Sequence, residues 1–196
     1  MKTLSFKKIA ITSVEDLRKL IGSPHELVAN KTITKIDEQA KKFIAASPLL
    51  FISTSNASGK CDVSPRGDLP GSILVLNDHQ LVIPDRPGNK RLDSILNILA
   101  NPHVGIIFLI PGFDEVLRVN GKATIIKDND ILKKMTLKGK PPLLGIGVDV
   151  EECYIHCPRA LKESEIWSPD KCPKNQDIPS MMEIFRAHLK INGIDY

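Results

Sequence analysis

The chain has 196 residues, of which 42% are hydrophobic and 26% charged, a composition typical of one globular domain with extensions. Its 27 basic and 23 acidic residues leave a formal charge of +4, spread along the chain, which argues against a general nucleic-acid binder. The longest apolar run, residues 104–110, is far shorter than the roughly 20 residues that cross a bilayer. With no signal-peptide pattern either, we expect a cytoplasmic protein that does not enter the membrane.

The first 46 residues predict short helices. Ser13 opens a capping-box pattern and Gly22 provides a stop, while Ser23, followed by proline and three residues later by glutamate, marks a second helix start. Apolar residues at helical spacing predict a third helix over residues 37–46. We expect residues 1–46 to form a helical extension packed on the following domain.

Short β-like runs dominate the next 120 residues, separated by turn signals. The runs cover residues 49–53, 61–64, 72–76, 81–83, 103–110, 116–126 and 143–156, with one amphipathic helix over residues 89–100. About six strands in hairpin-like order, with no alternation of strands and helices, predict a mainly β fold built as an antiparallel barrel or a strongly curved sheet. We place this domain at residues 47–167, followed by a tail at residues 168–196 with a helix near 180–191.

Several common kinds of site are absent from the sequence. There is no nucleophile elbow, no phosphate loop and no complete dinucleotide fingerprint, and the paired acids do not converge. Cys153 and Cys157 share one face of a predicted strand while His156 points the other way, so a shared metal ion is hard to arrange. We therefore interpret these two cysteines, and Cys61 and Cys172, as buried or incidental thiols and predict no metal site, while the sequence identifies no catalytic side chain.

Residues 64–91 stand out because three arginines, one lysine, four prolines and three glycines occur there together. Proline and glycine fix unusual backbone geometry. The basic residues lie where a strand gives way to the helix predicted from residue 89, whose first amide groups lack partners within the helix. Such a place can bind a phosphate, and in one reading Arg66, Arg86, Lys90 and Arg91 gather around one anion site. The alternative is that Arg66, Arg86 and Arg91 are structural.

In that alternative, the three arginines pair with three acidic residues in turns of the same chain. The acidic residues are Asp68, Asp85 and Asp93. The residues alone favour neither reading.

The order of the motifs resembles the FMN-binding split-barrel proteins related to pyridoxamine 5′-phosphate oxidase. The resemblance rests on residues 64–68, 84–91, 97–102, 111–112 and 117–121 and extends over roughly residues 47–167. It implies a six-stranded antiparallel split β-barrel that forms a homodimer, with FMN bound noncovalently at the subunit interface. It places the flavin beside residues 64–68 and 83–85, the phosphate at residues 89–91, and Arg118 in the strand that lines the flavin pocket. The residues that it implies for cofactor binding are Ser64, Arg66, Gly67, Asp68, Ile83, Pro84, Asp85, Asn89, Lys90, Arg91 and Arg118.

The resemblance implies an FMN-dependent oxidoreductase that acts on an unknown small molecule, with electrons passing through the flavin. True pyridoxamine-phosphate oxidase activity is not expected, because the substrate-binding arginine and histidine of those enzymes have no counterpart after Trp167. One alternative is a flavin-binding module without turnover. Another is a protein that binds haem or deazaflavin, in which His103 and His156 are candidate haem ligands. Trp167 could cover the flavin or simply pack in the core or an interface.

Overall fold

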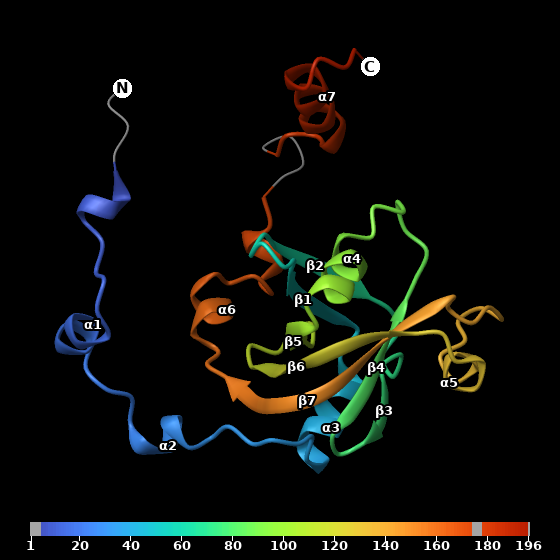
Figure 1. The fold of residues 1–196 in the computed structure, drawn as a ribbon, viewed down its shortest axis with the longest axis horizontal. Helices are drawn as coiled ribbons and strands as arrows, with labels where there is room; N and C mark the ends of the chain where they lie inside the picture. Colours follow the sequence, from blue (N-terminus) through green and yellow to red (C-terminus); the bar gives the residue numbers. More distant parts are fainter. Residues whose placement is uncertain (1–4, 174–177, 196) are drawn as a thin grey trace.

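The computed structural model describes residues 5–173 and 178–195, and its centre is a strongly twisted antiparallel sheet (Figure 1). Seven strands pair in the order β2-β1-β5-β6-β7-β4-β3. They are β1 (Leu49–Ser55), β2 (Cys61–Gly67), β3 (Leu74–Asn77), β4 (Gln80–Asp85), β5 (His103–Leu109), β6 (Val116–Ile126) and β7 (Leu144–His156). The mainly β class with flanking helices is confirmed.

The expected strand number of six needs correction, and the expected split barrel is seen here as a curved sheet that is open. The short runs predicted at residues 72–76 and 81–83 form a complete hairpin, β3–β4, which pairs with the first half of β7 and brings the strand number to seven. The sheet is not closed by hydrogen bonds, because β2 and β3 stand at its two ends. The end of the sheet that contains β2 and the end that contains β4 contact each other through side chains instead, as described below.

Strand alternation separates the core from an outer sheet face. On β1, Leu50 and Ile52 are at most 2% exposed, whereas Phe51 between them is 36% exposed. Phe51 pairs with Ile107 on β5, which is equally exposed and pairs in turn with Arg118 on β6. Directly paired residues share a face, so these side chains form a row across the outer face, and the sheet packs its core on the other side.

Two helices cover the core side. Helix α3 (Glu38–Ala46) begins at the Asp37 cap and buries Ala40 and Ile44. Helix α4 (Asp93–Ala100) buries Ile95 and Ile98. It is also tied to β1 and β2 by hydrogen bonds at three successive turns: Ser94 to Asp62, Asn97 to Thr54, and Asn101 to Ser55. These polar contacts fix the start of α4 against β2.

A β-bulge interrupts the pairing of β6 and β7. Asn120 pairs with Glu152 and Gly121 pairs with Val150, so Glu151 has no opposite residue on β6. A Cβ atom at Gly121 would lie 2.1 Å from the Asp149 carbonyl oxygen, which explains why β6 has glycine where it pairs with the bulged part of β7.

The remaining helices lie toward the ends of the chain and around the sheet. They are η1 (Phe6–Lys8), α1 (Val14–Ile21), α2 (Glu26–Ala29), α5 (Asn129–Lys133), α6 (Arg159–Glu163), η2 (Pro169–Lys171) and α7 (Met181–Ile191). Ser13 and Ser180 cap α1 and α7 through their side chains. For α2 the cap is His25, whose ring nitrogen accepts from Leu27, rather than the expected Ser23.

The terminal helices α1, α2 and α7 bury no residue in this single chain. Of the predicted N-terminal extension, α3 contributes to the core, and packing of the rest on the sheet stays a prediction. Within residues 5–173 and 178–195, no helix has the length and apolarity needed to cross a membrane.

Candidate functional site

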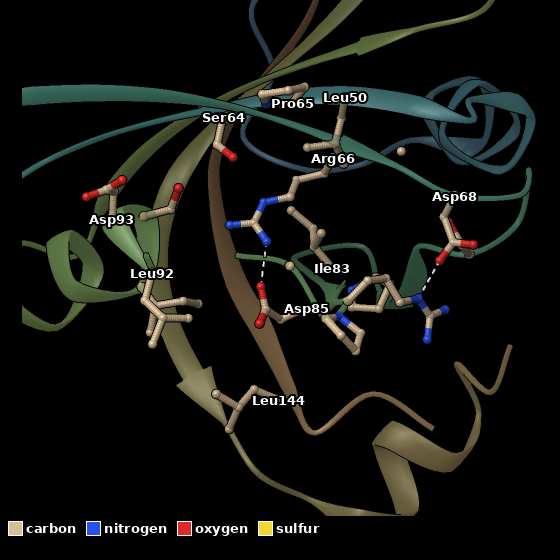
Figure 2. Close-up of a pocket in the computed structure, with 18 of the residues that line it drawn as sticks. Leu50, Ser64, Pro65, Arg66, Asp68, Ile83, Asp85, Leu92, Asp93 and Leu144 are labelled. Carbon is tan, nitrogen blue, oxygen red and sulfur yellow. Dashed lines mark hydrogen bonds and ion pairs between the residues drawn. The ribbon is translucent and has the colours of Figure 1, made fainter. Parts of the chain in front are cut away.

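A cavity of about 710 Å³ opens between β2, β4 and the start of α4 (Figure 2). This volume lies within the range of roughly 300–1,000 Å³ that small-molecule and cofactor sites occupy. One wall comes from residues 62–68 of β2 and the next turn, and the opposite wall from residues 83–95, which run from β4 into α4. The rest of the lining comes from residues 47–50 at the start of β1, from Ser72 and Ile73, and from Leu143 and Leu144 at the start of β7. The two segments singled out by their arginines and prolines therefore face each other across one space.

The structure brings most of the predicted cofactor-binding residues to this cavity. The residues that line it are Ser64, Arg66, Gly67, Asp68, Ile83, Pro84, Asp85, Asn89, Lys90 and Arg91. Sequence reasoning missed Asp62 and Ser94, which also line it and hydrogen-bond to each other at 3.0 Å. Ser94 is buried one residue after the helix begins, a position that could be found only once the true helix start was known.

Two ion pairs bridge the cavity walls crosswise. Arg66 Nη1 on β2 lies 2.5 Å from Asp85 Oδ1 at the end of β4, and Arg86 Nε lies 2.6 Å from Asp68 Oδ2 (Figure 2). The Arg86 side chain also donates to the Met135 carbonyl oxygen at 2.9 Å. Because β2 and β4 are not paired in the sheet, these side chains join the two halves of the fold. We call the four side chains Arg66, Asp68, Asp85 and Arg86 the clasp.

The segment before α4 differs from the expected helix. Helix α4 begins at Asp93, not at Asn89, because Lys90 and Leu92 adopt left-handed backbone conformations with φ of 63° and 61°. Arg91 lies between them and pairs with Asp93 at 2.5 Å, and its amide donates to the Asn89 side chain. The left-handed residues are not glycines, and strained backbone of this kind is often found at binding sites.

The charges of the cavity are balanced more closely than the sequence suggested. Each of Arg66, Arg86 and Arg91 has an aspartate within 2.6 Å, so the structural pairing considered for them is present. Arg66 and Arg86 pair across the cavity, between the two motifs. Lys90 is exposed, and no acidic partner is found for it among the residues that the structure describes.

The cavity nevertheless has unused donors that suit an anionic, nitrogen-rich cofactor. Arg66 Nε is buried and has no hydrogen-bond partner among the described residues, and a buried unpaired donor is costly unless a ligand satisfies it. The Leu92 cap supplies no side-chain acceptor to the first turn of α4, so its amide groups remain available to a phosphate beside Lys90. These features are compatible with FMN, the cofactor that the family resemblance implies.

Arg118 does not line this cavity. It lies on β6, directly opposite Tyr154 of β7, and its guanidinium carbon is 5.3 Å from the centre of the Tyr154 ring. His156 and His103 do not line the cavity either. Trp167 is half-buried and donates to the Phe113 carbonyl oxygen at 3.1 Å, a packing contact away from the lining residues.

The thiols fall into two groups. Burial raises the pKa of the Cys153 thiol to about 11, with a further contribution from the negative charge of Asp37. Cys61, Cys157 and Cys172 are exposed. In the described part of the chain, no three His, Cys, Asp or Glu side chains converge to hold a metal ion.

Comparison with known proteins gives a family and a set of distant structures. The model of the family described as pyridoxamine 5′-phosphate oxidase matches residues 36–157, the region that contains every strand and the cavity. No curated protein matches the chain. The N-terminal helices α1 and α2 and the tail that ends in α7 lie outside the matched region.

Among solved structures, HupZ of Group A Streptococcus is 19% identical, with 61% of this chain and 93% of that chain covered and a TM-score of 0.48. General stress protein 26 of Bacillus anthracis is 21% identical, with coverage of 60% and 91% and a TM-score of 0.41. HutZ of Vibrio cholerae, described as a heme storage protein, is 14% identical, with coverage of 62% and 94% and a TM-score of 0.41.

Proposed function

The chain belongs to the pyridoxamine 5′-phosphate oxidase family, and from this premise we propose that it is an FMN-binding flavoprotein and an oxidoreductase acting on a small molecule. The observation that carries the proposal is the convergence of residues 64–68 and 83–91 on one cavity that contains the unpartnered Arg66 Nε. Bound FMN would supply the redox chemistry, because the isoalloxazine ring accepts and donates electrons. The protein would supply binding, orientation and exclusion of water.

The residues of the cavity divide naturally between the two ends of such a cofactor. Lys90, the exposed Arg91 and the uncapped first turn of α4 form the end that suits a phosphate. Ile83 and Pro84 are buried and offer an apolar surface to a ring. Arg66, between these ends, would donate from Nε to a polar edge of the flavin while Nη1 stays paired with Asp85.

Haem is less well suited to this cavity than flavin. No histidine, cysteine, methionine or tyrosine is among its lining residues, so none of the usual protein ligands of haem iron is at hand there. A deazaflavin with a phosphate group would meet the same donors as FMN. A flavin-binding module without turnover would also have the same cavity, and only a reaction separates it from an oxidoreductase.

The homodimer remains part of the proposal. Arg118 lies outside the cavity of its own chain, so it would contact FMN only if a second copy brought it to the neighbouring cavity. A mass near twice 21.7 kDa in analytical ultracentrifugation is the expected result. A monomer that binds FMN with full affinity would contradict the shared site.

The visible spectrum of the purified protein tests flavin binding directly. We expect FMN to be present or to bind on addition, with its absorption bands shifted from those of free FMN. Protein that stays colourless after addition of FMN would reject the proposal. Anaerobic reduction of the bound flavin by NADH, NADPH or a reduced deazaflavin then tests the oxidoreductase, and a flavin that none of these donors reduces would favour the module without turnover.

The phosphate end is tested by changing Lys90 and Arg91 together to alanine. We expect FMN binding to weaken by about 2–4 kcal/mol, roughly 30- to 700-fold, because charge-assisted hydrogen bonds are worth about 1.5–3 kcal/mol each and do not simply add. Riboflavin, which lacks the phosphate, should bind the variant and the parent equally. Isothermal titration calorimetry with both ligands makes the measurement.

The matched control removes two positive charges far from the cavity, through Arg18→Ala and Lys19→Ala on α1, where neither side chain is buried. FMN affinity should be unchanged in this control. Equal weakening in both double variants would reduce the effect to net charge, and equal weakening of FMN and riboflavin would place the phosphate elsewhere.

A further inference from the structure

A buried ion pair crosses the cavity near its centre. The side chains of Arg66 on β2 and Asp85 at the end of β4 are 21% and 16% exposed, and Arg66 Nη1 lies 2.5 Å from Asp85 Oδ1 (Figure 2). Taking two charges out of water is costly, and apolar side chains of similar size often join two elements equally well. Joining β2 to β4 therefore does not explain why the chain uses charged side chains here.

The two arginines of the clasp differ in the donors that they leave free. Arg86 donates to Asp68 from Nε and to the Met135 carbonyl oxygen from Nη2. Arg66 donates to Asp85 from Nη1, and its buried Nε has no partner among the described residues. Figure 2 shows Asp68 to one side, and Arg66 and Asp85 between the two walls. Arg66 is therefore the clasp arginine that has donors left for a molecule bound in the cavity.

The backbone of β4 relates this ion pair to the apolar surface that we assign to the flavin ring. Ile83 and Asp85 both line the cavity, and because they are two residues apart on one strand, their side chains project from the same face. Ile83 is 1% exposed. A ring held against Ile83 would therefore have the Asp85 carboxylate and the Arg66 guanidinium group beside it.

A paired arginine and an unpaired one would act differently on such a ring. Transfer of a hydride, which is one proton with two electrons, from a reduced nicotinamide leaves the nicotinamide oxidised and adds one negative charge to the ring. A fixed positive charge in a site that excludes water stabilises that negative charge. Unpaired Arg66 would therefore favour the reduced flavin, and a carboxylate beside Arg66 offsets this preference.

Other cations of the chain are stabilised without a carboxylate. In the cluster at Tyr154, Lys31 Nζ and the Arg118 guanidinium carbon lie 5.6 Å and 5.3 Å from the centre of the aromatic ring. An aromatic ring attracts a cation but leaves its charge in place, whereas the Asp85 carboxylate offsets the charge of Arg66. The cavity is thus the place where this chain pairs its arginines with carboxylates.

We propose that Asp85 lowers the reduction potential of bound FMN by offsetting the charge of Arg66. This role rests on the FMN site proposed above and concerns the electron transfer of that same site. A lower potential makes the reduced flavin a stronger electron donor. The Arg66–Asp85 pair therefore favours a reaction in which the flavin reduces its substrate.

The reduction potential of bound FMN, measured by anaerobic titration against a reference dye, tests this role. Asp85→Asn keeps the shape of the side chain and an acceptor for Arg66 but removes the negative charge. We expect a more positive potential, with the affinity for reduced FMN rising about tenfold relative to oxidised FMN, equivalent to about 30 mV for a two-electron couple. An unchanged potential in FMN-loaded Asp85→Asn would overturn the proposal. Failure of the parent protein to bind FMN would instead reject the flavoprotein itself.

Removing both charges distinguishes an effect of charge from a loss of structure. Arg66→Gln combined with Asp85→Asn leaves no buried charge unpaired, a change that is often nearly neutral for stability. Because the ion pair and its neutral replacement carry the same net charge, the potential should return close to that of the parent. A potential as positive as in Asp85→Asn alone would contradict a role of charge.

The double variant also keeps the test valid if Asp85→Asn does not fold. It is then compared with Arg66→Gln alone, in which the Asp85 carboxylate remains. The potential of Arg66→Gln should be more negative than that of the double variant by about the same 30 mV. Equal potentials in these two variants would overturn the proposal.

Two other carboxylates provide the controls. Asp149→Asn removes the same charge from β7, where the side chain accepts from Gln80 at 2.8 Å and does not line the cavity; the potential should not change. Asp68→Asn removes the charge of the other clasp pair, which lies to one side (Figure 2), and should shift the potential less than Asp85→Asn. An equal shift in Asp149→Asn would reduce the effect to net charge, and an equal shift in Asp68→Asn would assign it to the clasp as a whole. Either result would overturn the role of Asp85.

Discussion

The cavity and the cluster at Tyr154 hold similar basic side chains in opposite electrostatic situations. In the cavity, the arginines of the clasp each meet an aspartate within 2.6 Å. At Tyr154, Lys31 and Arg118 meet only an aromatic ring. This difference in pairing shows that an arginine-rich motif does not by itself indicate an excess of positive charge. In this chain the paired arginines join two halves of a sheet, and unpaired cations lie on the outer face.

The largest effect is expected where the clasp is broken. Asp68→Ala leaves Arg86 without its partner, although the two side chains are only 8% and 22% exposed. Loss of one member of a buried pair costs about 3–5 kcal/mol, and we expect about 3 kcal/mol here because Arg86 keeps its bond to the Met135 carbonyl. Urea denaturation measures the change in the free energy of unfolding.

The comparison for that experiment is Asp93→Ala, which removes an aspartate from an arginine pair whose side chains are 76% and 42% exposed. Exposed pairs contribute about 0–1 kcal/mol, so this variant should lose about 1 kcal/mol or less. Similar losses in the two variants would contradict a structural role that is particular to the clasp.

A second effect concerns the core side of β7, behind Tyr154. Burial raises the pKa of Cys153 from 9.0 to about 11, which lowers its thiolate fraction about 100-fold at neutral pH. In native protein a thiol reagent should therefore label Cys61, Cys157 and Cys172 and leave Cys153 unlabelled until the chain unfolds. Peptide mass spectrometry identifies the labelled thiols. Rapid labelling of Cys153 would show that the sheet beneath the cluster opens easily.

A smaller effect tests the charge imbalance at Tyr154 without any ligand. Because the positive charge of Arg118 helps to lower the pKa of His156, Arg118→Gln should raise that pKa toward the ordinary value of 6.5. The parent should also lose stability as the pH falls through the interval below 6.5, because the unfolded chain takes up the proton first. This loss should be weaker in the variant.

An NMR titration of the His156 ring measures the pKa, and urea denaturation at several pH values follows the stability. Lys122→Gln, on the same strand, serves as the control and should leave the pKa of His156 unchanged. An unchanged pKa in Arg118→Gln would mean that Arg118 is too well screened to act on the imidazole, and the contrast between the two regions would then be weaker than the structure indicates.

The sequence predicted the fold best where the chain is locally periodic. Alternation in residues 49–53 and 116–126 indicated strands, and β1 and β6 cover them. Helix α4 was misplaced at its start, because Leu92 has helical spacing from Ile95 and Leu96 although Lys90 and Leu92 adopt left-handed conformations before the helix begins. Lysine and leucine, unlike glycine or asparagine, carry no sequence signal for that conformation.

The site was predictable as a set of residues but not as a set of contacts. Proline, glycine and arginine marked residues 64–91, and the cavity is lined from both ends of that segment. That Arg66 would reach Asp85, and Arg86 reach Asp68, depends on how β2 and β4 approach across an open sheet, which no local pattern encodes. The cluster at Tyr154 was missed for the same reason, since Lys31 and Arg118 are far apart in the chain.

The bulge at Glu151 determines which residues β7 presents to solvent. Before it, Ile146, Val148 and Val150 face the core, and after it Cys153 does; the extra residue thus reverses the alternation of the strand. Deleting Glu151 would remove the bulge and restore regular alternation, with Val150 and Cys153 still facing the core and Tyr154 and His156 still facing outward. A single extra codon therefore lets one strand carry two stretches of opposite phase, and its loss would straighten the strand while leaving the thiol inside and the basic side chains outside.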